Sequence, residues 1–187
     1  MFKRELQTAL PFPLEWQDFY ILTSLPRYLG KLSKPDVLWA QSRILEIVAT
    51  DKQHICDRQS QGHLLICAAV HAYYEILLLA GTSKRSAVEK LTFALMQPGS
   101  KTTKLIMWLT LKLCRDKRQM IENETRRKTQ TLYGKSFEFE EEVDETSFVS
   151  IVTKCAYFSY FKRHGLPHLT AIFCAWDAVW IDPIKGD

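Results

Sequence analysis

Apolar residues recur at helical spacing through most of the first 130 positions of the chain. One stripe between positions 38 and 48 predicts a helix that ends near Thr50, and Ser33 with Asp36 three positions later is typical of its start. Ser83, Gly81 and a Pro-Gly pair at 98–99 mark further starts and stops. The pattern predicts helices over 14–29, 34–50, 62–79, 84–96 and 100–129, with a polar loop over 51–61.

The period changes after Gly134. Phe137, Phe139 and Val143 alternate with glutamates, which predicts a half-exposed β-strand. A turn at 144–145 and a β-branched run at 148–153 then predict a second strand. Two helices follow, over 157–163 and 167–180. We therefore expect a predominantly helical α+β fold in a single domain over 1–187. Its helical part covers 1–130, and a β-hairpin with two helices covers 131–187.

Composition and charge narrow the class of protein. The chain is 47% hydrophobic, which suffices for a buried core, and its net charge is only +4. Its densest basic stretch, 115–128, is interrupted by acidic residues and has no interleaved aromatics. We interpret that stretch as a solvated helix face, with an anion or RNA patch as the alternative. Nucleic acid is therefore not an expected partner.

Cysteine usage and the apolar runs indicate the compartment. The five cysteines form no CxxC pair and no evident disulfide framework, which favours a cytoplasmic protein. The most apolar run, 64–80, is broken by His71 and Glu75, so we expect a core helix and no membrane span. The N-terminus lacks the pattern of a signal peptide.

Two cysteines near the C-terminal end are candidates for chemistry. Cys174 and Asp177 are three positions apart, so on a helix the thiol and the carboxylate share one face. Cys155 stands where a strand is expected to meet a helix, and the free N–H groups of a helix start can favour a thiolate. The alternative for each cysteine is a small packed hydrophobic residue, and for Asp177 a place at the edge of the buried face.

Histidines supply further candidates. His63, Cys67, His71 and Glu75 follow one another at steps of four, so they form one stripe on a helix. A metal site is one interpretation, but HExxH is absent and the helix is apolar, so we favour polar residues of the core or of a pocket and expect no metal.

His164 and His168 flank the turn Gly165-Leu166-Pro167, where they can reach a substrate or act as solvated caps. We take His164, His168 and His71 as candidate substrate-binding residues. The chain has no P-loop, no GxGxxG and no GxSxG, so we expect no nucleotide cofactor and no esterase fold.

The stretch from Cys155 to Asp177, CAYFSYFKRHGLPHLTAIFCAWD, resembles the L-2-amino-thiazoline-4-carboxylic acid hydrolase family. Members share a strand that ends in Cys, a short helix, a Gly-x-Pro turn and a Phe-Cys-x-x-Asp motif. The resemblance covers roughly 137–181, and more weakly the helix around HAYYEILLLAGTSKRSAVEKL. It implies hydrolysis of a C–N bond in a small cyclic amidine, with a thiazoline ring opened toward a carbamoyl-cysteine.

Carried over by position, the resemblance implies Cys155, Cys174 and Asp177 as the candidate catalytic residues. Cys174 or an activated water would attack the ring carbon, and Asp177 would handle protons. Family members usually continue into another strand with a further Cys, whereas this sequence ends at Asp187. We therefore expect a shortened relative or part of a longer chain. The alternatives to a hydrolase are a non-catalytic small-molecule binding or sensing domain and a helical interaction module that uses residues 115–129.

Overall fold

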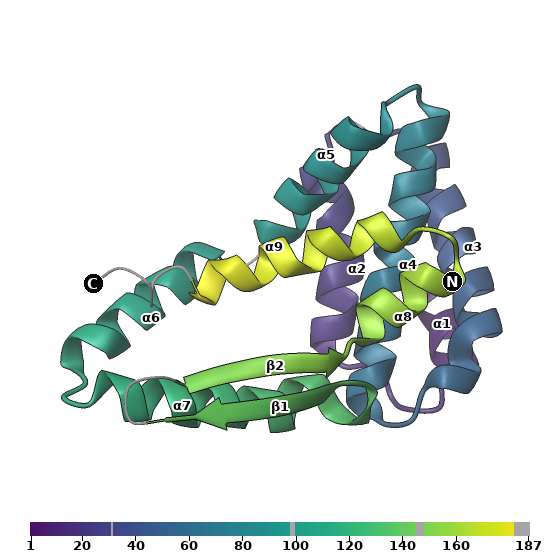
Figure 1. The fold of residues 1–187 in the computed structure, drawn as a ribbon. Coiled ribbons are helices and arrows are strands. Elements are labelled where there is room, and N and C mark those ends of the chain that lie inside the picture. Colours follow the sequence, from purple (N-terminus) through teal and green to yellow (C-terminus); the bar gives the residue numbers. More distant parts are fainter. Residues whose placement is uncertain (31, 98–99, 145–147, 182–187) are drawn as a thin grey trace.

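The computed structural model describes residues 1–30, 32–97, 100–144 and 148–181 (Figure 1). It confirms the predicted predominantly helical α+β fold. The α-helices and strands are α1 (Phe2–Ala9), α2 (Trp16–Tyr28), α3 (Lys34–Asp51), α4 (Arg58–Leu79), α5 (Lys84–Met96), α6 (Ser100–Leu113), α7 (Lys117–Lys128), β1 (Glu138–Val143), β2 (Phe148–Lys154), α8 (Ala156–Arg163) and α9 (Thr170–Ile181). Shorter helical turns are η1 (Lys52–His54), η2 (Thr129–Tyr133), η3 (Gly134–Ser136) and η4 (Pro167–Leu169).

Helix α4 is the centre of the fold. It packs against α2, α3, α5 and α8, and nearly all of its residues from Leu64 to Leu77 are buried (Figure 1). By length and composition alone, Arg58–Leu79 could cross a membrane, but 72% of its most apolar window is buried inside the protein. The large side chains of Tyr73 and Tyr74 fill the surrounding core. The run 64–80 is therefore the core helix that its polar interruptions predict.

Local start signals place several helices correctly. The Ser33 hydroxyl accepts from the Asp36 N–H, and the Asp36 carboxylate accepts from the Ser33 N–H, so the predicted capping box is confirmed. Ser83 likewise caps α5. The prediction for α4 is wrong by one turn, because Asp57 caps the helix and α4 begins at Arg58 within the segment that we expected to be a loop.

The single helix predicted over 100–129 is instead two helices. Helix α6 ends at Leu113, and Asp116 accepts from the Gln119 N–H to start α7. An aspartate at this position competes for backbone N–H groups, which favours a new start over continuation. The apolar α6 also leaves large side chains in solvent: Leu105, Ile106, Trp108, Leu109 and Leu113.

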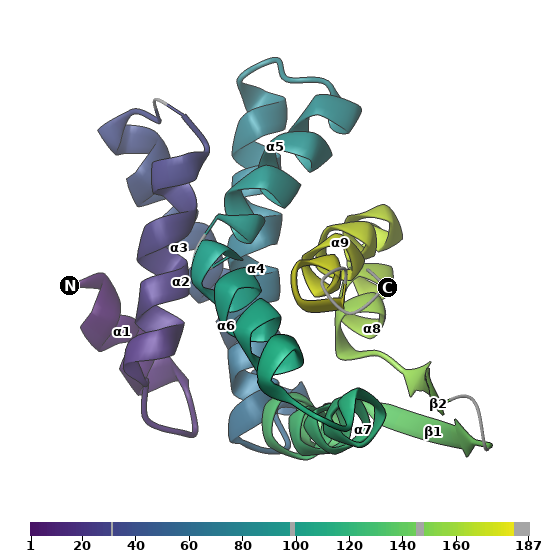
Figure 2. The same ribbon diagram turned by 90° about the vertical axis from the view of Figure 1, so that its left-hand side faces the viewer.

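The predicted hairpin is confirmed as an antiparallel pair of β1 and β2 with Val143 opposite Phe148. Phe137 is buried and Phe139 is half-buried, but Val143 is 51% exposed. The apolar side chains of the predicted alternation therefore reach the core only at the beginning of this segment. Residue 145 of the predicted turn at 144–145 lies outside the described residues. The chain end beyond 181 also lies outside them. Figure 2 shows the hairpin projecting away from the helices, whereas α8 and α9 lie back beside the helical body.

Candidate functional site

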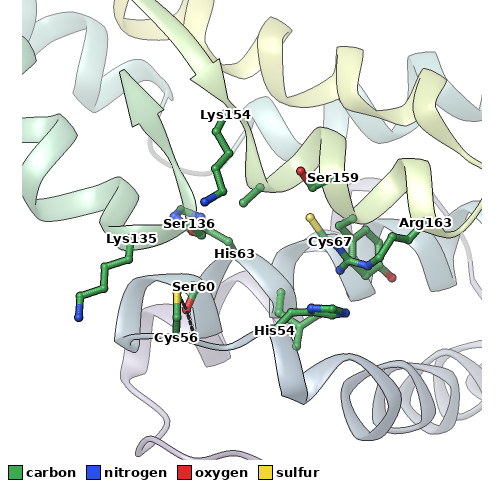
Figure 3. A pocket seen from close by; sticks show the side chains of 13 residues that line it. His54, Cys56, Ser60, His63, Cys67, Lys135, Ser136, Lys154, Ser159 and Arg163 are labelled. Carbon is green, nitrogen blue, oxygen red and sulfur yellow. Dashed lines mark hydrogen bonds between the residues drawn. The ribbon is translucent and has the colours of Figure 1, made fainter. Parts of the chain in front are cut away.

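A pocket of about 210 Å³ lies between the start of α4, the segment around η3, the end of β2 and α8 (Figure 3). Its walls combine two thiols, several hydroxyl groups and a set of basic side chains, and none of its lining residues within the described part of the chain is acidic. The basic members are His54, His63, Lys135, Lys154 and Arg163. The pocket is smaller than the roughly 300–1,000 Å³ typical of drug-sized ligands, so a small ligand fits it.

Three cysteines lie in or beside this pocket. Cys56 and Cys67 line it; the Cys56 thiol is 3.6 Å from the Ser60 hydroxyl, and Cys67 is almost fully buried. Burial, together with the neighbouring Cys155, raises the pKa of the Cys67 thiol well above its usual value. Cys67 is therefore a poor nucleophile at neutral pH.

Cys155 stands where the sequence predicts, between β2 and α8. It is the N-cap residue of α8, and its Sγ accepts from the Phe158 N–H at 3.5 Å. Its two chain neighbours, Lys154 and Ala156, both line the pocket. This thiol is thus held at the pocket edge by the strand-to-helix junction.

The buried His71 belongs to a chain of polar side chains that begins at a residue of the pocket wall. Its Nε2 lies 3.2 Å from Glu75 Oε1, and the Glu75 carboxylate binds the Arg43 guanidinium at 2.9 and 3.2 Å. Because a carboxylate only accepts, Nε2 carries the proton. Burial lowers the pKa of His71 and favours the neutral ring, so Nδ1 accepts from the Tyr160 hydroxyl at 3.0 Å. Tyr160 itself lines the pocket.

His164 belongs to a second polar group, which surrounds the buried Asp51 carboxylate. Its Nε2 donates to Asp51 Oδ2 at 2.8 Å, and Arg163 donates to Asp51 Oδ1 at 3.1 Å. The Asp51 side chain is only 5% exposed, so its charge is compensated by these two partners. The His164 ring also lies 5.1 Å from the His71 ring, measured between centroids. The structure therefore brings together two of the histidines that we proposed as substrate-binding residues.

His63 separates this pocket from a second one of about 390 Å³, since it lines both. Burial lowers its pKa and favours the neutral ring. Nε2 lies 3.3 Å from the Tyr133 carbonyl, which only accepts, so Nδ1 accepts from the Tyr157 hydroxyl at 3.0 Å. His63, Cys67, His71 and Glu75 thus contact different partners. In the described part of the chain, no group of three or more His, Cys, Asp or Glu side chains could hold a metal ion.

The remaining candidates lie elsewhere. Cys174 is exposed on α9 and does not line the pocket. Asp177 belongs to the same helix, but its side chain lies outside the described set. His168 is an exposed residue whose Nε2 lies 3.0 Å from the Tyr74 hydroxyl. None of the candidate catalytic or substrate-binding residues with a described side chain lines the pocket. Cys155 and His164 adjoin residues that line it, and His71 is hydrogen-bonded to the lining residue Tyr160.

Three arginines of the basic stretch at 115–128 form ion pairs with glutamates. Arg118 pairs with Glu122, Arg127 pairs with Glu124, and Arg126 pairs with Glu141 of the hairpin, each at 2.8–3.0 Å. Glu122 and Glu124 are among the acidic residues that interrupt the stretch in the sequence, whereas Glu141 comes from β1.

Several pocket residues were not singled out by the sequence. Lys154 and Arg163 had only a weak signal in the sequence, since each is the chain neighbour of a candidate residue, Cys155 or His164. Asp51, which lies outside the pocket lining but positions Arg163, had no signal in the sequence, because its partners lie 112 and 113 positions away. Cys56 lies in the polar segment 51–61, where no sequence pattern singles it out.

One comparison with known proteins gives a result. A family model described as L-2-amino-thiazoline-4-carboxylic acid hydrolase matches residues 63–187. No curated protein and no solved structure shows a significant match to the chain. The matched segment runs from α4 to the C-terminal end, and it contains every pocket-lining residue except His54, Cys56 and Ser60.

Proposed function

Since the chain belongs to the L-2-amino-thiazoline-4-carboxylic acid hydrolase family, we propose that it hydrolyses a C–N bond of a small cyclic amidine or thiazoline-type compound and so opens the ring. The observation that carries this proposal is the match over 63–187, because that segment supplies most of the pocket between α4 and α8. All five cysteines are free, which agrees with a reducing, cytoplasmic setting.

The chemistry needs a nucleophile and a proton donor. Water, or a cysteine Sγ that water later displaces, adds to the amidine carbon. The C–N bond of the ring then breaks, the nitrogen takes a proton and leaves as an amine, and the carbon keeps the oxygen of the water. Cys155, Cys174 and Asp177 remain the proposed catalytic residues. Cys155 is the first thiol to test, because both of its chain neighbours line the pocket.

The test incubates the purified chain with 2-amino-thiazoline-4-carboxylic acid and follows, by liquid chromatography and mass spectrometry, a product heavier by one water. We expect turnover that falls at least about a hundredfold when an essential catalytic group is removed. The variants are Cys155→Ser, Cys174→Ser and Asp177→Asn, with Cys114→Ser as the matched control outside the pocket. Full activity in all three variants would remove these residues from the mechanism.

A non-catalytic binding or sensing domain is the second candidate function. The pocket is compatible with it, because a small site with basic and hydroxyl groups can bind a ligand whether or not a reaction follows. Saturable binding of the same compound, with no product from the wild-type chain, would favour this function over hydrolysis.

A further inference from the structure

Two cationic side chains reach the pocket from different elements. Figure 3 shows Lys154 extending from the end of β2 toward Ser136, and Arg163 extending from α8 toward Cys67. Lys135 also borders the pocket, but its side chain points away from the other labelled residues. The basic character of the pocket therefore comes mainly from two cations on different walls.

The Arg163 guanidinium is held in place by a buried carboxylate outside the pocket lining. Asp51 binds one of its N–H groups at 3.1 Å, and Asp51 is in turn fixed by His164. A guanidinium has five N–H donors. Within the described part of the chain, the bond to Asp51 is the one hydrogen bond that Arg163 side-chain donors make. The remaining donors can bind a ligand without loss of the bond that positions the side chain.

The Lys154 ammonium is held more loosely. It pairs with Glu138 of β1 at 2.7 Å, and the two side chains are 51% and 62% exposed. An exposed pair of this kind contributes at most about 1 kcal/mol. A ligand carboxylate can therefore replace or join Glu138 at little cost, and the hydrogen bond from Lys154 would again be charge-assisted.

We propose that Lys154 and Arg163 form a clamp for the carboxylate of a small-molecule ligand, and that this clamp sets the specificity of the pocket for carboxylic acids. The absence of acidic side chains among the described lining residues and the small volume of about 210 Å³ support this ligand class. The inference rests on the proposed function only in taking this pocket as the reaction site.

The experiment compares two probes that have no amidine carbon to hydrolyse. Thiazolidine-4-carboxylate carries the carboxylate, and thiazolidine lacks it. Titration calorimetry on the full chain at low salt should show binding of the carboxylate that is at least about tenfold tighter, since a charge-assisted hydrogen bond contributes that much or more. Raising the salt concentration should weaken only the carboxylate.

Variants assign the effect to the clamp. Lys154→Gln and Arg163→Gln should each weaken binding of thiazolidine-4-carboxylate about tenfold or more. Lys162→Gln is the control, because Lys162 lies next to Arg163 on α8 but does not line the pocket. Arg163→Lys keeps the charge and should retain part of the affinity. Thermal unfolding of each variant confirms that the protein used in the titration is folded.

The outcomes separate the two proposals. Equal affinity for the two probes, or equal losses in Lys154→Gln and Lys162→Gln, would overturn the clamp even if the chain opens thiazoline rings. Tight, clamp-dependent binding of thiazolidine-4-carboxylate by a chain that shows no hydrolysis would support the clamp and defeat the proposed hydrolase function.

Discussion

Asp51 and His164 are 113 positions apart, yet His164 Nε2 donates to the nearly buried Asp51 carboxylate at 2.8 Å. The contact joins the last residue of α3 to the residue that follows α8. Arg163 binds the other carboxylate oxygen, so one side chain of the helical part orients two consecutive residues of the C-terminal part. The position of Arg163 at the pocket therefore depends on a residue outside the pocket lining.

Replacing Asp51 tests this dependence. We expect Asp51→Asn to lower the free energy of unfolding by about 1–3 kcal/mol, because it removes a charge at a nearly buried position that is hydrogen-bonded to Arg163 and His164. Chemical denaturation would measure the change. Glu46→Gln is the control, since Glu46 also pairs with an arginine but is 62% exposed, and its loss should cost less than about 1 kcal/mol. Equal losses would show that the Asp51 contacts contribute little.

Stability should fall as the pH drops below about 6.5. Burial lowers the pKa of both His63 and His71 from the ordinary value of 6.5. The unfolded chain therefore takes up protons at these histidines before the folded chain does, and acid shifts the equilibrium toward the unfolded state. The contribution of the two histidines to the free energy of unfolding is complete above about pH 6.5. It is lost as the pH falls toward their lowered pKa values in the folded protein.

Thermal unfolding between about pH 8 and pH 5.5 checks this prediction, since carboxylates stay largely ionised in that range. His63→Gln and His71→Gln should each flatten the dependence, whereas His54→Gln should not, because His54 is exposed. A midpoint that stays constant over this range in the wild-type chain would contradict it.

The thiols should differ sharply in reactivity. Cys67 is 1% exposed and its pKa is raised by burial, so it should resist iodoacetamide near neutral pH. Cys56 and Cys174 are exposed and should be alkylated in the folded protein. Peptide mass spectrometry over a time course would give each rate, with the denatured chain as the reference in which all five cysteines react. Labelling of Cys67 as fast as that of Cys174 would show that the pocket opens readily.

The sequence predicted most of the fold, because its signals are local. Ser33 and Ser83 start helices through hydrogen bonds to residues three positions away, and the alternation after Gly134 depends on neighbouring side chains. The failures are also local conflicts. Asp116 stands inside a continuous helical pattern, yet its carboxylate starts a new helix. Asp57 starts α4 one turn earlier than the apolar pattern does.

The site was less predictable, because its contacts are long-range. Periodicity placed His71 on the buried face of α4, but it could not assign Tyr160, 89 positions later, as the partner of the ring. The motif at 155–177 directed attention to Cys155, which borders the pocket. It directed equal attention to Cys174, whose helix turns that side chain into solvent. Spacing within one helix does not specify which face the rest of the chain will cover.

Gly134 connects the start of α4 to the pocket. Its φ of 59° lies in the left-handed region, and a Cβ there would come within 2.6 Å of Asp57 Oδ2 and 2.7 Å of Gln59 Cβ. The Asp57 carboxylate cannot move freely, because it accepts from the Ser60 N–H at 2.7 Å to cap α4 and from the Lys135 N–H at 2.6 Å. A side chain at position 134 must therefore break the cap or displace the segment that carries Lys135.

We expect Gly134→Ala to destabilise the protein by about 2–3 kcal/mol, of which about 1 kcal/mol is the left-handed backbone and the rest is the lost cap. Gly165→Ala is the matched control, because Gly165 has a φ of 72° but no described atom within 4 Å of its added Cβ, so it should cost only about 1 kcal/mol. Denaturant unfolding of the two variants measures the difference. Equal costs would mean that Asp57 and Gln59 yield to the methyl group and that the cap of α4 does not fix the pocket wall.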